Sequence, residues 1–96
     1  MKLYNKFTIG VVFDIESQCD KLKERLETVV DDLDVTKRNV KGDDDDDHTY
    51  YELILKCDTG TSTLVSGTRI RWDSTDDPED DETVANFINW LKDFPL

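Results

Sequence analysis

Residues 3–13 read LYNKFTIGVVF, and the alternation of side chains in this stretch decides the fold. Every second residue from Phe7 to Phe13 is apolar, which predicts a half-buried strand with one face in the core. Gly10 lies on the other face, and a glycine inside a strand indicates a bulge or the close approach of another group. The strand therefore needs a layer of apolar side chains on one side only.

Two predicted helices can supply this layer. Asp14 can cap a first helix, in which apolar residues recur at spacings of three and four. The resulting stripe comprises Ile15, Cys19, Leu22, Leu26, Val29, Val30 and Leu33. Near the end of the chain, Asp77 is the predicted cap of a second helix, with Pro78 at its first position. The stripe of this helix comprises Val84, Phe87, Ile88, Trp90, Leu91 and Phe94.

Three more strands are predicted between the helices. Residues 35–41 form a weak, basic strand that suits a sheet edge. Residues 49–57 alternate, and residues 58–60 (DTG) predict a hairpin to a return strand at residues 61–72. The order βαβββα predicts an α+β fold, a two-layer sandwich with a mainly antiparallel four-stranded sheet and two helices on one face. The crossover through the first helix could add one parallel pair.

Composition is consistent with one small acidic domain. The chain has 96 residues and a formal net charge of -11, and its apolar residues gather in the periodic segments. Disorder is therefore expected only in the acidic loops, at about 42–48 and 73–77. No stretch is long enough to cross a bilayer, and the first strand lacks the features of a signal peptide. Cys19 and Cys57 lie on predicted apolar faces, so we expect buried free thiols in a cytoplasmic protein, although a bridge between them stays possible.

The acidic residues are concentrated in three runs that contain no lysine or arginine, and these runs hold 15 of the 23 acids. Acids at the end of the first helix oppose its macrodipole, and a locally unfavourable choice can indicate function. We expect these acids to bind a partner. They are Asp31, Asp32 and Asp34; Asp43, Asp44, Asp45, Asp46 and Asp47; and Asp73, Asp76, Asp77, Glu79, Asp80, Asp81 and Glu82.

The second run, which His48 follows, has three interpretations. It could be a solvated loop, a recognition loop that orders against a basic partner, or a calcium site. An EF-hand loop needs a glycine at its sixth position and a distal glutamate, and this run has neither. We therefore expect no metal site.

No catalytic motif accompanies the acids. His48 is the only histidine, and the chain has no G-x-S-x-G motif, reactive-cysteine pattern or glycine-rich phosphate loop. Paired carboxylates could serve glycoside hydrolysis, but these acids lie in solvated runs of a short chain. We therefore expect neither an enzyme nor a bound cofactor. The charge also opposes direct binding to nucleic acid or to an anionic membrane.

These features favour a small acidic inhibitor that blocks a basic nucleic-acid-binding protein by electrostatic mimicry of DNA or RNA. Carboxylates would stand where phosphates otherwise sit, and opposite charge would speed association. In size and charge the chain resembles the phage-encoded DNA mimics, including anti-restriction and anti-CRISPR proteins, and the resemblance implies a host-cell cytoplasmic location. It carries over no residue roles.

Three alternatives stay open. The first is an immunity protein or antitoxin that neutralises a basic nuclease toxin. The second is an acidic adaptor or oligomeric structural module that binds through the second face of the sheet. The sequence leaves open whether the protein is a monomer or a dimer. The other interpretation of that face is an ordinary exposed surface with cross-strand pairs. Its predicted residues are Tyr4, Tyr50, Ile54, Val65, Arg69 and Arg71. In the third alternative, adaptation to high salt would explain the charge without any partner.

Overall fold

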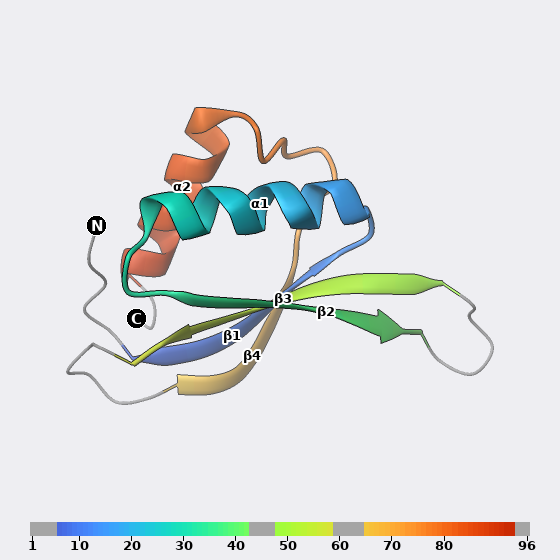
Figure 1. Ribbon diagram of the computed structural model, residues 1–96, viewed down its shortest axis with the longest axis horizontal. Coiled ribbons are helices and arrows are strands. Elements are labelled where there is room, and N and C mark those ends of the chain that lie inside the picture. Colours follow the sequence, from blue (N-terminus) through green and yellow to red (C-terminus); the bar gives the residue numbers. More distant parts are fainter. Residues whose placement is uncertain (1–5, 43–47, 59–64, 94–96) are drawn as a thin grey trace.

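The computed structural model describes residues 6–42, 48–58 and 65–93. This part of the chain forms four strands and two helices, which confirms the α+β class and the predicted order of elements (Figure 1). The elements are β1 (Phe7–Phe13), α1 (Glu16–Val29), β2 (Asp34–Lys41), β3 (Thr49–Cys57), β4 (Val65–Arg71) and α2 (Asp81–Asp93).

The strands form one mixed sheet in the order β2-β3-β1-β4. β3 is antiparallel to β1 and to β2, whereas β1 and β4 are parallel. The prediction of a mainly antiparallel sheet therefore holds for two of the three strand pairs. The crossover through α1 does not create the parallel pair, because β3 lies between β1 and β2. The predicted hairpin at residues 58–60 is wrong, since β1 lies between β3 and β4, and residues 59–60 themselves lie outside the described residues.

The core lies between the sheet and the helices. In Figure 1 both helices lie above the sheet, with α1 along it and α2 at its left-hand end. One side of the strands and one stripe of each helix are buried, as the periodicity predicted. These buried residues are Phe7, Ile9, Val11 and Phe13 of β1, Leu53, Leu55 and Cys57 of β3, Cys19, Leu22 and Leu26 of α1, and Val84, Ile88 and Leu91 of α2.

The start of α1 differs from the prediction. The residue before the helix is Ile15, whose side chain makes no cap hydrogen bond. Asp14, the predicted cap, instead accepts hydrogen bonds from Arg71 at 2.7 and 2.6 Å. The predicted stripe is correct at its centre and wrong at two positions, because Ile15 and Val29 are exposed. The Asp14 carboxylate therefore pairs with Arg71 of β4 and does not cap α1.

The start of α2 also differs, because the helix begins at Asp81 and not at Pro78. Asp80 acts as the cap in place of Asp77. Its Oδ2 accepts hydrogen bonds from the backbone N–H of Thr83 at 3.3 Å and from the Thr83 hydroxyl at 2.9 Å. Pro78 is fully buried in the preceding turn. Proline is common both at the first position of a helix and in turns, and Pro78 lies in a turn.

A row of aromatic rings connects α2 to the sheet. Phe13 stacks on Trp72 with ring centroids 5.5 Å apart, and Phe87 meets Trp72 edge-on at 5.6 Å. Trp90 stacks on Phe87 at 5.8 Å and is 39% exposed. Offset and edge-on pairs contribute about 0.5–1.5 kcal/mol each beyond the area they bury. This row therefore holds the last helix against the rest of the domain.

Both cysteines are free and buried, as predicted. Burial raises the pKa of the Cys19 thiol to about 11, because the low-dielectric core disfavours the thiolate. The thiol is therefore protonated at neutral pH and packs as a small apolar side chain.

Candidate functional site

The side of the sheet that faces away from α1 is called the open face below. Strand register places alternate residues of all four strands on it. Three of the four arginines of the chain belong to this face, although the protein carries a net charge of -11. Tyr4 and the side chain of Val65, which were predicted here, lie outside the described part. The open-face residues include Thr8, Gly10, Val12, Thr36, Arg38, Val40, Tyr50, Glu52, Ile54, Lys56, Arg69 and Arg71.

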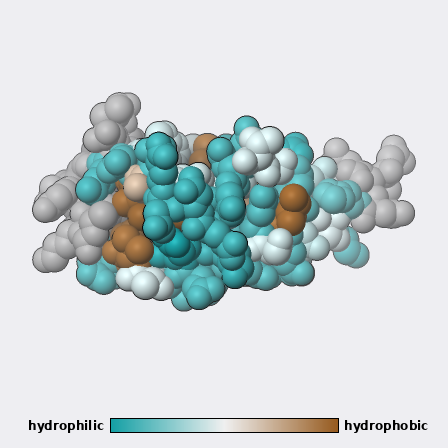
Figure 2. All heavy atoms as spheres, turned by 90° about the horizontal axis from the view of Figure 1, so that it is seen from above, coloured by the Kyte–Doolittle hydropathy of each residue, from teal (hydrophilic) through white to brown (hydrophobic). Residues whose placement is uncertain are grey.

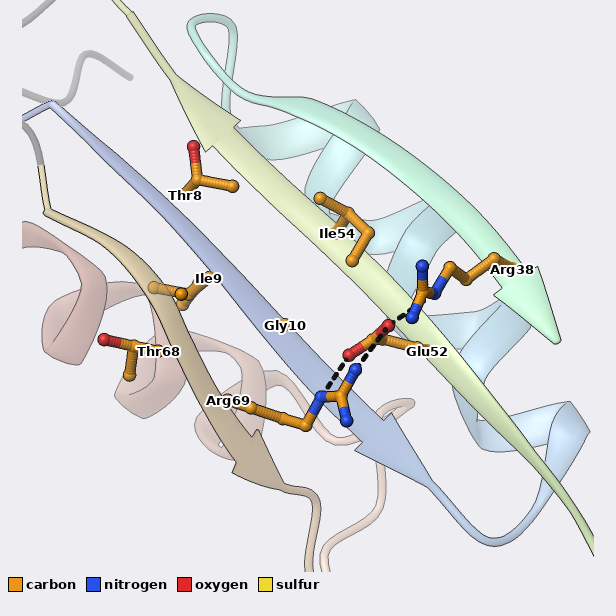
Figure 3. A pocket seen from close by; sticks show the side chains of 9 residues that line it. Thr8, Ile9, Gly10, Arg38, Glu52, Ile54, Thr68 and Arg69 are labelled. Carbon is orange, nitrogen blue, oxygen red and sulfur yellow. Dashed lines mark hydrogen bonds and ion pairs between the residues drawn. The ribbon is translucent and has the colours of Figure 1, made fainter. Parts of the chain in front are cut away.

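Glu52 is buried although it lies on the open face, and its side chain is only 1% exposed. Arg38 on β2 places its Nε 2.7 Å from Oε1 of Glu52. Arg69 on β4 donates from Nε to Oε2 at 2.8 Å and from Nη2 to Oε1 at 3.4 Å. Figure 3 shows the two guanidinium groups approaching the carboxylate from opposite sides. A buried carboxylate needs such pairing, because an unpaired one would be very costly.

Gly10 on β1 provides the space for this carboxylate. A Cβ at this position would lie 2.5 Å from Oε2 of Glu52 and 3.2 Å from its Cδ. Of the two predictions for Gly10, a bulge or the close approach of another group, the close approach is correct, and the approaching group is the Glu52 carboxylate. The bulge lies instead in β4, where the register with β1 shifts and Gly67 has a φ of 82°. The sequence interpretation missed the burial of Glu52, although arginines on two other strands were a usable signal.

Two hollows share Arg69 on the open face. The first has a volume of about 370 Å³ and contains the Arg38–Glu52–Arg69 cluster at one end. The second has a volume of about 360 Å³ and is lined by Val12, Val40, Tyr50, Arg69 and Arg71. The guanidinium carbon of Arg71 lies 5.9 Å from the centre of the Tyr50 ring, within the range of a cation–π contact. The open face thus combines fixed arginines with an apolar depression.

The third acidic run, residues 73–82, is called the acidic segment below, and its carboxylates form turns and a cap. Asp73 Oδ1 accepts hydrogen bonds from the backbone N–H of Thr75 at 2.9 Å and from its hydroxyl at 2.7 Å. The hydrogen bond from the Thr75 backbone is the larger cause that lowers the pKa of Asp73, and the hydrogen bond from the Thr75 hydroxyl adds to it. Asp77 Oδ1 accepts the backbone N–H of Glu79 at 2.9 Å. The carboxylates of Asp73 and Asp77 are therefore each held in one orientation.

Other contacts anchor the acidic segment to the domain. The indole N–H of Trp72 donates to the backbone oxygen of Asp76 at 3.0 Å, and Gln18 of α1 donates to the backbone oxygen of Ser74 at 2.9 Å. Lys21 lies 2.9 Å from Glu79, which raises the pKa of Lys21 through a hydrogen bond and charge attraction. A second ion pair joins Arg25 of α1 to Asp81. The segment therefore has a defined position along α1.

A third hollow, of about 320 Å³, lies between the end of β4 and α2. Asp73 and Asp76 of the acidic segment line it, and so do the rings of Trp72 and Phe87. Arg71, Ile70, Thr83 and Asn86 complete the lining. Carboxylates beside aromatic rings can hold a cationic side chain.

The predicted acidic residues do not form one patch. Asp31 and Asp32 lie in the turn after α1, and Asp34 begins β2. The acidic segment contacts α1 between Gln18 and Arg25, whereas these three acids follow the helix end. Residues 43–47 lie outside the described residues. The structure therefore gathers only the seven acids of the third run: Asp73, Asp76, Asp77, Glu79, Asp80, Asp81 and Glu82.

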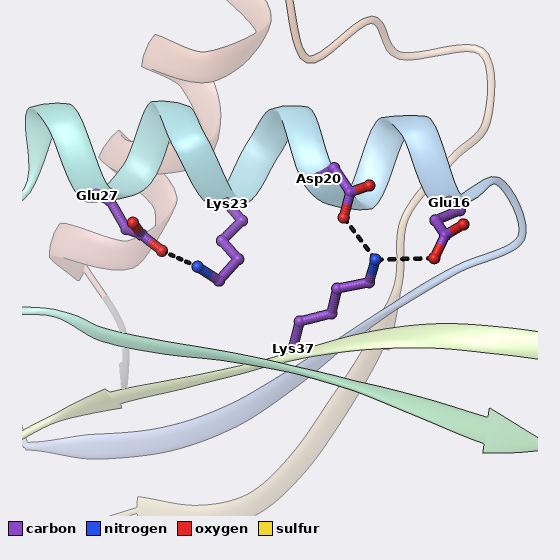
Figure 4. Close-up of polar contacts among 5 residues, drawn as sticks. All are labelled: Glu16, Asp20, Lys23, Glu27 and Lys37. Carbon is purple, nitrogen blue, oxygen red and sulfur yellow. Dashed lines mark hydrogen bonds and ion pairs between the residues drawn. The ribbon is translucent and has the colours of Figure 1, made fainter.

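Several acids of α1 pair with bases of the same domain. Lys37 of β2 donates to Asp20 at 2.6 Å and to Glu16 at 2.9 Å, and Lys23 pairs with Glu27 on α1 (Figure 4). The hydrogen bonds to Asp20 and Glu16 raise the pKa of Lys37. Figure 2, which views the domain from above, shows a largely hydrophilic surface on the helix-bearing side. The two ion pairs of Lys37 attach α1 to β2.

Within residues 6–42, 48–58 and 65–93, no three His, Cys, Asp or Glu side chains converge as a metal site would require. His48 meets the Tyr50 ring edge-on, with ring centroids 4.6 Å apart. No helix in the described ranges has the length and apolar character needed to span a membrane.

Comparison with protein-family models found no match, and comparisons with curated proteins and with solved structures found none either. Function must therefore be argued from the surfaces described above.

Proposed function

We propose that this protein is an acidic inhibitor that binds a basic partner through the acidic segment and blocks the partner's nucleic-acid site. The observation that carries the proposal is the fixed orientation of Asp73, Asp77 and Asp80 by hydrogen bonds. Each of these hydrogen-bonded carboxylates uses one oxygen for its internal contact. The other oxygen is left for a cation of the partner.

Fixed carboxylates favour binding in two ways. They lose little conformational freedom when a partner docks, so less of the interaction free energy is spent on ordering. They also stand at set positions, as the phosphates of a nucleic acid do. The net charge of -11 would attract a basic surface and speed encounter.

The hollow beside the acidic segment suggests how one contact is made. A lysine or arginine of the partner would enter between Asp73 and Asp76 and lie against the Phe87 ring. Charge-assisted hydrogen bonds and a cation–π contact would act together there. The same chemistry serves an inhibitor of a nucleic-acid-binding protein and an immunity protein against a basic nuclease, so the identity of the captured partner separates the two.

The test is a capture experiment followed by an inhibition assay. Tagged protein is used to capture basic proteins from a host lysate at low and at high salt, and each captured protein is assayed for DNA or RNA binding. The double variant Asp73→Asn/Asp77→Asn removes two of the fixed charges and keeps the side-chain oxygens that accept the backbone N–H groups of Thr75 and Glu79. Asp32→Asn/Asp34→Asn removes the same charge at the other end of α1 and is the matched control.

We expect the first variant and high salt to abolish capture and inhibition, and the control to retain both. Surface attraction weakens in salt because the Debye length falls from about 10 Å at 0.1 M to about 3 Å at 1 M. If the Asp73→Asn/Asp77→Asn variant still inhibits nucleic-acid binding at full strength, the acidic segment is not the inhibitory surface.

A second candidate function, an adaptor or oligomeric module, is favoured by the open face. Its hollows bring Tyr50, Ile54 and three arginines to a surface of the sheet. Aromatic and arginine side chains are enriched at the centres of protein interfaces. This candidate predicts that Tyr50→Ala disrupts an assembly that the acidic-segment variant leaves intact.

A further inference from the structure

We propose that the open face binds a short acidic peptide segment of a partner protein. A carboxylate of the peptide would bridge Arg38 and Arg69, and a neighbouring apolar side chain would fill the hollow formed by Val12, Val40 and Tyr50. The inference rests on the second candidate function, for which it names the chemistry of the partner. It makes no use of the acidic segment.

Glu52 prepares the two arginines for such a ligand. Both guanidinium groups contact the same buried carboxylate, so they lie close together and are held in orientation. Each side chain is nonetheless more than half exposed, at 55% for Arg38 and 56% for Arg69. A guanidinium has five N–H donors, and the contacts with Glu52 use only one or two of them. The remaining donors and the surplus positive charge suit a second carboxylate, which can accept bidentate hydrogen bonds.

The second hollow supplies the apolar half of the site. Arg69 lines both hollows, so a ligand on its guanidinium group is adjacent to the depression of Val12, Val40 and Tyr50. Arg71 at the far side is held by Asp14 and lies over the Tyr50 ring, so this boundary is also fixed. In the peptide, an acidic residue would contact Arg69, and a neighbouring residue the size of leucine would fill the hollow of Val12, Val40 and Tyr50.

Charge distinguishes a peptide from other occupants. Arg71 is paired with Asp14, and Lys56 lies 3.4 Å from Asp58, so the positive field of the open face is local. Nucleic-acid binding needs an extended positive field, which a protein with a net charge of -11 opposes. A symmetric contact with a second copy would place arginines against arginines. A single carboxylate on a peptide needs only the local donors.

The test is an NMR titration of the ¹⁵N-labelled full chain with a short capped peptide that carries one glutamate beside a leucine. We expect shift changes at the Nε–H groups of Arg38 and Arg69 and at open-face amides of β1 and β3. A matched peptide with glutamine in place of glutamate should bind at least about tenfold more weakly, because it cannot form charge-assisted hydrogen bonds with the arginines. A poly-dT oligonucleotide tests the nucleic-acid alternative, and sedimentation velocity tests self-association.

Three variants complete the test. Arg69→Gln should weaken peptide binding by about tenfold, but it also leaves Glu52 with one arginine and so destabilises the fold. Val40→Glu keeps the Arg38–Glu52–Arg69 cluster and places a negative charge in the apolar hollow, so it should weaken the peptide at least as much. Lys23→Gln removes a positive charge from α1 and should leave peptide affinity unchanged.

The proposal is overturned if the glutamine peptide binds equally well, if shifts occur on α1 instead, or if no shifts are seen. It is also overturned if only the oligonucleotide binds the open face, or if the face is occupied by a second copy in solution. Failure of the adaptor candidate is measured separately, by whether Tyr50→Ala disrupts an assembly, so it is distinct from loss of peptide binding. Failure of the inhibitor proposal is measured by capture through the acidic segment.

Discussion

Substitution of Gly10 by alanine tests the arrangement around Glu52 most directly. The new Cβ would lie 2.5 Å from Oε2, and ordinary contact begins at 3.4 Å, so the carboxylate must move by roughly 0.9 Å. Glu52 is almost fully buried between Arg38 and Arg69, so this movement lengthens or breaks hydrogen bonds that satisfy a buried charge.

The expected loss of stability follows from these contacts. Removing one partner of a buried ion pair costs about 3–5 kcal/mol, and the half-exposed arginines reduce this cost because water can approach them. Alanine in a strand recovers about 0.5–1 kcal/mol relative to glycine. We therefore expect Gly10→Ala to lower the free energy of unfolding by about 2 kcal/mol, which corresponds to a fall in Tm of about 8–16 °C for a domain of this size.

Urea denaturation of a double-mutant cycle with Glu52→Ala is the assay. In the Glu52→Ala background, Gly10→Ala should be neutral or stabilising by up to about 1 kcal/mol, because the obstructing carboxylate is gone. Gly67→Ala is the matched control. Its φ of 82° makes alanine strained with no atom nearby, so its cost should be equal in both backgrounds. An equal cost of Gly10→Ala in both backgrounds would refute the steric account.

Three further predictions concern other contacts. Lys37→Met should lower the free energy of unfolding in urea by about 0.5–1 kcal/mol at low salt, and a difference undiminished at about 1 M salt would contradict the ion-pair explanation. Cys19 and Cys57 should react with a thiol reagent only after unfolding, because both are buried. Burial also raises the folded-state pKa of Cys19 to about 11, so the contribution of this thiol to stability is full below pH 9.0 and is lost as the pH rises toward 11. The lowered pKa of Asp73 makes its contribution full above its ordinary pKa of 3.8 and lost as pH falls through the folded-state pKa. Thr75→Ala should raise that pKa in an NMR titration of the carboxyl carbon, and an unchanged value would show that the hydroxyl does not stabilise the carboxylate.

Local patterns in the sequence were sufficient for the elements. Alternation predicted β3 with its observed bounds, and helical spacing predicted the buried centre of α1. The pairing of strands was not predictable in this way. The turn signal at residues 58–60 favoured a hairpin, yet β4 pairs with β1 because the non-local contacts of the whole sheet decide the neighbours. At α2, Asp77 was the predicted cap, but Asp80 caps the helix in the structure and Pro78 is buried in the turn before it.

The acidic runs could be counted from the sequence, but their roles could not be assigned. Turn hydrogen bonds and ion pairs with α1 depend on distances that charge alone does not indicate. Glu52 was missed for the same reason, since Arg69 is 17 residues away in the chain and reaches it only across the sheet. Gly10 gave a partial indication, because a glycine within an otherwise regular strand predicted that some group approaches it closely.

The place of β1 in the sheet has a consequence for biosynthesis. When translation has delivered the chain only as far as Cys57, β1 can pair with β3, but its other edge waits for β4. Fourteen further residues must be added before Arg71 completes that strand, which takes about 1–3 s at the usual 5–20 residues per second. During that interval FTIGVVF presents unsatisfied backbone groups on an apolar strand, which is a template for intermolecular β-pairing. Chains that terminate early, before β4, should therefore aggregate or recruit chaperones while the full-length protein remains dispersed.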